Sequence, residues 1–388
     1  MLTTTETSGP APTEMRSAAV AALPEVRPRR VLALGVGRRV AVALGDAGLA
    51  VALDPSAEDA AAAVRDRQVS AVVHVPGMPV ADAVAARLRM EPAFDEVPFV
   101  GVVARSRFDE VEVAFATGVD DVIAADETAL LAARLQRLHT RAADGVRLPA
   151  IVADPDRRAR ATWGRVLRRA GFDVRFAADA AGLAEACDAR FTGMRGCVVA
   201  DGGTALAHLQ AGGDLGALWV ICTDGHLPAA LASAAHGRPN VAIHGQDDPP
   251  ENILHLVNEL REPRLGELRA SRRVLYGAPV RLRPAGREEG AWGMTYNLSA
   301  NGFYIRTLCG LPTGTHLWLE LRPPGADRLV HVEAKVVWSK PFGAFGRPIV
   351  PAGMGFELVD ATAADLESYA SGYRALLARS GVPAPHRM

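Results

Sequence analysis

Short apolar runs alternate with alanine-rich stretches between residues 30 and 140. The runs at 30–36, 69–75 and 97–104 are rich in valine and show no polar alternation, which is typical of parallel strands buried on both faces. The segment 56–67 between two of them has the spacing of an amphipathic helix. This order of strand, helix and strand predicts a doubly wound α/β sheet.

The same layout returns after a polar linker at 139–149. Apolar runs occupy 150–156, 196–201 and 218–224, and the segment 157–171 has helical periodicity. Because both the elements and their order repeat, we expect a second α/β domain of the same kind.

From about residue 268 the pattern changes to strict alternation. In "THLWLELR", 315–322, three leucines face one way, and "LVHVEAKVVWS", 329–339, alternates likewise, which places Trp338 on the apolar side and predicts that it is core. The segment 362–381 has one apolar helical face, with Thr362 and Asp365 suited to its start. These patterns predict a small antiparallel β-barrel closed by a helix.

The patterns divide the chain into five parts. We expect a flexible leader at 1–28, a first α/β domain at 29–140, a second at 148–262, a β-barrel at 268–380 and a tail at 381–388.

Composition narrows the class of protein. The chain is 49% hydrophobic and 22% charged, and no apolar run approaches the length needed to span a bilayer. The leader lacks the basic start and apolar core of a secretory signal, so we expect a cytoplasmic protein without membrane insertion. A net charge of -1 argues against nucleic acid as a partner. The four cysteines show no metal-binding or disulfide spacing.

Charge is nevertheless concentrated in one segment. Residues 261–287 hold eight arginines and two glutamates, so an anionic partner is expected there, the alternative being a solvated linker. Within it, "RASRRV" places Arg269 and Arg273 four residues apart, with Arg272 between them. Further along, a turn between predicted strands carries "NLSANG", 297–302.

The pair RxxxR and NxSxxG, at the start of a β-barrel with a closing helix, resembles the PilZ family, which binds cyclic di-GMP. The resemblance covers about 268–380. It implies that the nucleotide is bound by Arg269, Arg273, Asn297, Ser299 and Gly302, the glycine keeping the turn open through its small size or a positive φ. Arg272 either adds a phosphate contact or faces water. Trp292 and Tyr276 are candidates for stacking on a base.

The layout of both α/β copies resembles the receiver domains of response regulators, which have a flavodoxin-like doubly wound fold. That resemblance implies acidic residues, a hydroxyl and a lysine around a phosphate-accepting aspartate. The first copy has Gly35, His74, Val103 and Ala125 in these places, so we interpret it as a pseudo-receiver.

The second copy comes closer to the receiver pattern. Asp154, Asp201 and Thr223 match it, whereas Pro155 and His244 do not. Proline offers Mg²⁺ no ligand, so the favoured interpretation is that Asp201 is a solvated carboxylate at a strand end and that no metal is held. The alternative is that Asp201 accepts phosphate, with Mg²⁺ held by Asp154 and Asp201.

The sequence thus predicts a non-enzymatic cyclic di-GMP effector. No catalytic set of side chains stands at convincing spacing. We expect the PilZ-like domain to bind the nucleotide and the receiver-like domains to contact protein partners, including a possible second copy of the chain. The rival hypotheses are an adaptor that binds no nucleotide, a response regulator phosphorylated at Asp201 and, third, a nucleic-acid-binding protein.

Overall fold

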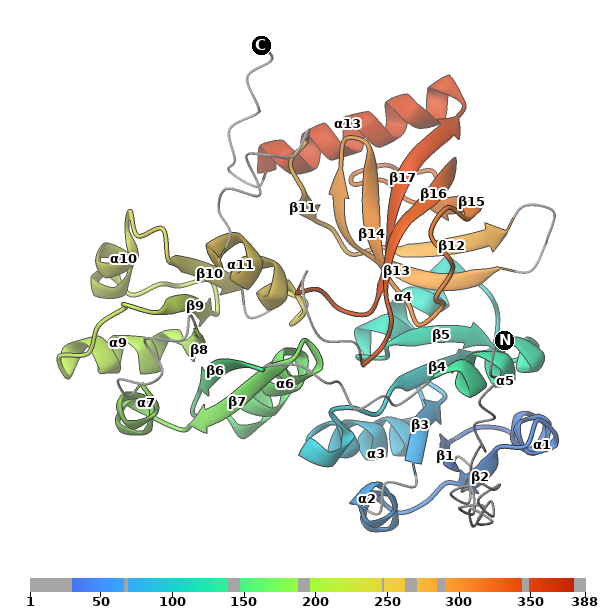
Figure 1. Cartoon of the computed structure of the whole chain (residues 1–388), viewed down its shortest axis with the longest axis horizontal. Helices are drawn as coiled ribbons and strands as arrows, with labels where there is room; N and C mark the ends of the chain where they lie inside the picture. Colours follow the sequence, from blue (N-terminus) through green and yellow to red (C-terminus); the bar gives the residue numbers. More distant parts are fainter. Residues whose placement is uncertain are drawn as a thin grey trace, which may run out of the picture.

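The computed structural model describes residues 30–65, 69–138, 147–187, 196–245, 248–261, 271–284, 290–343 and 349–379. The expected leader at 1–28, the tail at 381–388 and Arg269 lie outside the described residues. The described part forms two α/β domains followed by a β-barrel (Figure 1).

The first domain is a parallel sheet of five strands in the order β2-β1-β3-β4-β5. This is the flavodoxin-like order of doubly wound folds, in which helices cover both faces. The central strands β3 and β4 are buried along their whole length and are mostly apolar, because helices cover both faces of the sheet, as the sequence predicts. The elements are β1 Arg30–Leu34, α1 Arg38–Asp46, β2 Ala50–Leu53, α2 Ala57–Arg65, β3 Val69–His74, α3 Pro79–Arg89, η1 Pro92–Phe94, β4 Phe99–Val103, α4 Phe108–Ala116, β5 Asp121–Ala124 and α5 Thr128–Arg137.

The second domain repeats this topology. Its five strands are ordered β10-β9-β8-β6-β7, which is the same winding read from the other edge. The expected repeat of the fold is therefore confirmed. The elements are β6 Leu148–Ala153, α6 Arg157–Arg169, β7 Phe172–Ala177, α7 Ala180–Ala186, β8 Cys197–Asp201, α9 Gly202–Gln210, β9 Leu218–Thr223, α10 Ala229–Ala235, β10 Val241–Gly245 and α11 Asn252–Arg261.

The third domain is a closed antiparallel barrel. Six of the described strands pair in the order β13-β12-β15-β16-β17-β14, and β14 returns to pair with β13. The two-residue strand β11 pairs with β13 beyond the end of β12, on the same edge. The elements are β11 Val274–Leu275, β12 Pro279–Pro284, β13 Ala291–Ser299, β14 Gly302–Arg306, β15 His316–Leu321, β16 Val330–Lys340, β17 Gly353–Ala361 and α13 Ala363–Arg379.

Helix α13 closes one side of the barrel core. Thr362 and Asp365 exchange hydrogen bonds at its start, as expected of a capping pair. Tyr369 and Tyr373 are buried in the core, but Leu366, on the predicted apolar face, is 42% exposed. The buried stripe is thus narrower than the sequence pattern suggests.

One residue on the barrel departs from its predicted side. The alternation places Leu317 and Val336 in the core, but Trp338 is only partly buried and packs in a separate cluster with Tyr296 and Tyr304. The register of β16 against β17 shifts between Val336 and Trp338. A bulge inserts one residue and reverses the side that later residues face, so the core prediction for Trp338 is wrong.

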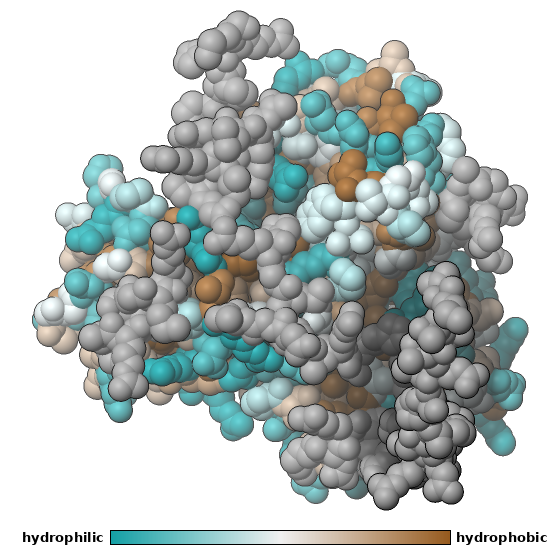
Figure 2. Space-filling view, viewed as in Figure 1, coloured by the Kyte–Doolittle hydropathy of each residue, from teal (hydrophilic) through white to brown (hydrophobic). Residues whose placement is uncertain are grey.

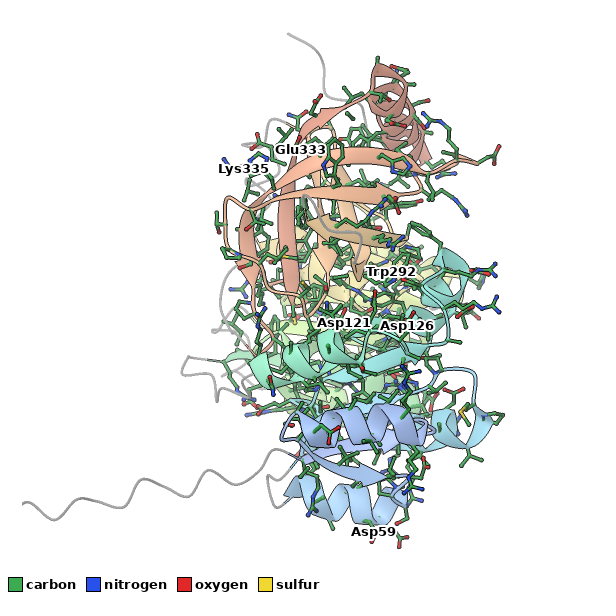
Figure 3. The ribbon with its side chains drawn as sticks, turned by 90° about the vertical axis from the view of Figure 1, so that its right-hand side faces the viewer. Asp59, Asp121, Asp126, Trp292, Glu333 and Lys335 are labelled. Atoms are coloured by element: carbon green, nitrogen blue, oxygen red, sulfur yellow. The ribbon has the colours of Figure 1, made fainter. Side chains whose placement is uncertain are left out.

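The barrel docks on the first domain through Trp292. This β13 side chain is 1% exposed and packs among Val103, Phe115 and other apolar residues of the first domain. Its ring meets Phe108 edge-on at 4.9 Å, and its indole N–H donates to the Ser106 hydroxyl at 2.8 Å. Figure 3 shows Trp292 at the boundary between the barrel and the first domain, above Asp121.

The two α/β domains meet through charges. Arg168 of α6 pairs with Asp95 at 2.8 Å, and Arg169 pairs with Asp120, both carboxylates belonging to the first domain. All these side chains are largely buried, so each charge requires its partner.

Apolar side chains on the surface are dispersed. The large exposed ones come from all three domains, and Figure 2 shows small brown groups between teal residues on one face. Within the described part of the chain, no helix has both the length and the apolar character needed to cross a bilayer.

Replacing Trp292 with alanine should loosen the barrel from the first domain. Removing a buried tryptophan leaves a large cavity and costs about 3–5 kcal/mol. Hydrogen exchange of the β5 amides should therefore rise in Trp292→Ala. Trp318 is 44% exposed on the same barrel, so Trp318→Ala is the control and should leave β5 unchanged. Equal protection of β5 in the parent protein and in Trp292→Ala would contradict this role.

Candidate functional site

The NxSxxG motif forms the tight turn between β13 and β14. Ser299 and Gly302 face each other in the last register pair of the hairpin. The Ser299 hydroxyl donates to the carbonyl of Gly302 at 2.9 Å, which fixes the turn from within. Asn297 lies two residues earlier, paired with Tyr304 on one side and with Leu275 of β11 on the other.

The closing helix holds this turn from the other side. The Tyr369 hydroxyl lies 2.9 Å from the Ser299 carbonyl and 3.0 Å from the Gly302 carbonyl. Burial raises the pKa of Tyr369 far above its usual value, so the group stays protonated and remains a donor. The sequence pattern assigned Tyr369 to the apolar face of a helix and gave no sign of this contact.

Gly302 is required for its small size, which is one of the two expected reasons, but the group that it avoids is backbone of the barrel. It lies outside the positive-φ residues, and a Cβ atom there would overlap the Phe356 carbonyl of β17. The glycine therefore allows β14 to pair closely with β17, and its small size matters for the barrel itself. The expected positive φ is wrong.

The structure places residues 271–275 beside the end of β13 that carries the NxSxxG motif. The Tyr373 hydroxyl of α13 donates to the Arg272 carbonyl at 2.7 Å. Arg272 is exposed and Arg273 half-buried, and β11 follows directly, with Leu275 opposite Asn297. Two parts of the predicted site, far apart in sequence, are thus adjacent in space.

Asn297 is 4% exposed, and aromatic rings surround this part of the barrel wall. Its register partner Tyr304 stacks on Trp338, with ring centroids 4.8 Å apart and planes at 14°. Tyr296 meets Tyr304 edge-on at 6.0 Å. Trp338 is thus a half-buried indole beside the motif, which the sequence analysis missed because it assigned the residue to the core.

The two aromatic residues considered for base stacking have other roles. Trp292 is enclosed between the barrel and the first domain, so the stacking interpretation is wrong for it. The Tyr276 hydroxyl donates to the Arg322 carbonyl at 2.7 Å, and burial raises the pKa of Tyr276 to about 12. Its ring packs against the barrel core.

Asp201 serves as the N-cap of α9. Its carboxylate accepts a hydrogen bond from the Thr204 amide at 2.9 Å, so it satisfies a free donor at the helix start. Asp154 accepts from the Asp156 amide at 2.6 Å. Burial first, and the Asp156 and Asp201 charges after it, raise the pKa of Asp154. Each carboxylate already has a partner within the protein.

The histidines at the acceptor and lysine places are buried. His74 is 0% exposed and lies 3.5 Å from Asp82; burial and the charge of Arg89 lower its pKa to about 4, so it is neutral at pH 7. His244 is 2% exposed, and burial lowers its pKa as well. A neutral histidine at the lysine place cannot offset phosphoryl charge as a lysine does.

Replacing Gly302 with alanine should destabilise the barrel. The added methyl group meets backbone, which cannot move aside, so we expect a loss at the upper end of about 1–3 kcal/mol. The matched control is Gly310→Ala, because a Cβ at Gly310 meets nothing within 4 Å. Denaturant unfolding should separate the two variants, and equal midpoints would refute the packing role.

Asp201 should resist phosphorylation by small phosphodonors. It caps a helix, and His244 in the lysine place is neutral. Incubation with acetyl phosphate and Mg²⁺, followed by intact mass measurement, should show no added phosphate. Stoichiometric labelling that Asp201→Asn abolishes would instead support the response-regulator hypothesis.

Comparisons with known proteins found one family model and several solved structures similar to parts of the chain. The PilZ domain model matches residues 267–372. No curated protein matches the chain. Similar solved structures include the Bacillus subtilis inhibitor of motility MotI/DgrA, at 25% identity and TM-score 0.24 over 29% of this chain and 51% of that one. Thus the chain spans about half of that protein.

Two further structures align with different parts of the chain. The PilZ domain of YcgR from Escherichia coli with c-di-GMP aligns at 12% identity and TM-score 0.23, over 29% of this chain and 93% of that one. A putative two-component response regulator/GGDEF domain protein aligns at 15% identity and TM-score 0.28, over 60% of this chain and 99% of that one. Residues 267–372 are a PilZ domain, and it follows two α/β domains with the flavodoxin-like strand order.

Proposed function

We propose that this protein is a non-enzymatic cyclic di-GMP effector whose PilZ domain binds the nucleotide. The observation that carries the proposal is the meeting of the two motif halves: the segment ending at Arg273 runs into β11, which pairs with β13 at Asn297. A PilZ domain is a binding domain, so any effect on a partner follows from the bound state.

The chemistry of the nucleotide fits these residues. Cyclic di-GMP presents two phosphates and two guanine edges, and a guanidinium fork can donate two parallel hydrogen bonds to either. In the proposed complex Arg269 and Arg273 bind these groups, and Arg272, which is exposed, adds a phosphate contact. Asn297 and Ser299 contact a guanine, and Trp338 offers an aromatic surface for stacking beside them.

In the proposed complex, nucleotide binding affects the second domain in two ways: through the chain that connects α11 to the barrel, and through non-covalent contacts. Helix α11 ends at Arg261, directly before the segment that carries the arginines. At its other end, the Tyr296 hydroxyl donates to the Glu251 carbonyl at 2.9 Å, and Arg306 pairs with the Glu251 carboxylate at 2.6 Å. If the bound nucleotide draws the segment ending at Arg273 onto the barrel, that segment acts on the end of α11, whose start the barrel already holds. The resulting shift of α11 would change the surface that the second domain presents to protein partners.

One observation favours the adaptor alternative. Asn297 is 4% exposed, so a nucleotide reaches its amide only when covering groups move aside. In an adaptor the Asn297 amide would only stabilise the barrel wall, and protein partners would bind without nucleotide.

Calorimetric titration of the full chain with cyclic di-GMP tests the proposal. Arg273→Ala should weaken binding by about thirty- to a hundredfold, because a phosphate or guanine edge loses its charged partner. Arg273→Lys should restore only part of this, since a point charge does not replace the fork. Trp338→Ala should weaken binding by about tenfold through lost stacking.

Two variants serve as controls. Arg374 is an exposed arginine of α13 paired with Glu367, and Arg374→Ala should bind like the parent protein. Trp318→Ala controls for loss of an indole from the barrel. No heat of binding from the parent protein at micromolar nucleotide would refute the sensor hypothesis and leave the adaptor in its place.

A further inference from the structure

A cavity of about 660 Å³ lies where the three domains meet, apart from the PilZ motif. It is lined by α3 of the first domain, α6 of the second and the ends of β14 and β16 of the barrel. Arg306 lines it at the end of β14, whereas the motif turn lies at Gly302 at the other end. Four residues of strand separate the two places by about 13 Å.

The lining is strongly basic. Seven arginine and lysine side chains face four carboxylates around the cavity. All four carboxylates already have basic partners: Asp95 pairs with Arg168, Asp120 with Arg169, Glu251 with Arg306, and Glu96 with Arg147. The cavity therefore keeps an excess of positive charge.

Arg165 is the most buried of the basic side chains that line the cavity. Its side chain is 7% exposed, and among the described residues neither terminal nitrogen has a hydrogen-bond partner. Its nearest carboxylate, Asp120, lies 3.9 Å away and is already engaged by Arg169 and by the Phe99 amide. Burial and then the charge of Arg169 lower the pKa of Arg165. A buried guanidinium with free donors is costly, and an anion would relieve that cost.

Arg89 lines the same cavity as Arg165 and contacts the same aromatic ring. Both guanidinium groups stack on the ring of Phe99, at 4.6 and 4.5 Å from its centroid. Two nitrogens of Arg89 are likewise buried without a hydrogen-bond partner in the described part of the chain. Guanidinium groups whose donors lack hydrogen-bond partners among the described residues suit the oxygens of a phosphate group.

The remainder of the lining is apolar. Leu254, Leu308 and Phe342 come from α11 and the barrel and face the same space as the two arginines. The volume lies within the range of sites for small organic molecules and far exceeds that of a bare phosphate ion. We propose that this cavity binds a small phosphorylated organic molecule, with its phosphate held by Arg89 and Arg165. Such a ligand touches all three domains and stabilises their arrangement.

Thermal unfolding of the full chain tests this site with three probes: pyrophosphate, guanosine 5′-monophosphate and guanosine, each at matched ionic strength. Both phosphates at millimolar concentration should raise the melting temperature of the parent protein, and guanosine should not. Arg165→Met should weaken phosphate binding by about thirtyfold and keep or raise the melting temperature without ligand, because it removes a buried unpaired charge.

Controls separate this site from the PilZ motif and from general charge effects. Arg157 lies on α6, is exposed and is outside the cavity, so Arg157→Gln should respond like the parent protein. Arg273→Ala should also respond, because the proposed nucleotide site is separate. Should Arg165→Met fail to fold, Arg89→Gln takes its place. Absence of any phosphate-dependent rise in the parent, or an undiminished rise in the arginine variant, would overturn the proposal.

Discussion

Burial of charge on α6 determines how the second domain meets the first. The second domain extends three arginines of α6 toward the first domain: Arg165, Arg168 and Arg169. Arg168 pairs with Asp95, and Arg169 pairs with Asp120. A buried ion pair stabilises an interface only when both partners are in place, so these contacts permit few relative orientations of the two domains. The third arginine, Arg165, is left in excess, and the cavity beside it lies within the same junction.

The barrel is held by different forces on its two sides. On the first domain it is fixed by an apolar anchor, Trp292, and by the Thr307 hydroxyl, which lies 3.4 Å from Asp121. Burial raises the pKa of Asp121, although the adjacent Arg134 acts in the opposite direction. On the second domain the contacts are mixed: Tyr296 and Arg306 bind Glu251, and the buried Ile349 packs in the apolar core of that domain while its carbonyl accepts from the Asn258 amide.

The candidate site was predicted in part. The sequence named both halves of the motif and placed them at the barrel, and the structure joins them through β11 and β13. It could not reveal Tyr369 as the support of the turn, because that contact crosses 67 residues and an apolar helical face gives no sign of it. The role of Gly302 was hidden for a similar reason, since the atom that excludes a side chain belongs to β17, far along the chain.

The sequence alone determined the fold of each domain. Strands repeat every second residue and helices about every 3.6 residues, because local backbone geometry sets these periods. Apolar runs and alternating patterns therefore predicted the two α/β domains and the barrel. Tertiary structure decided what local pattern cannot encode. The bulge in β16 turned Trp338 out of the core, and the docking surface buried Trp292. The packing of α6 left Arg165 beside a cavity, with no hydrogen-bond partner for its terminal nitrogens among the described residues. In each case the deciding neighbour is remote in sequence, and a side chain's role depends on which remote groups reach it in space.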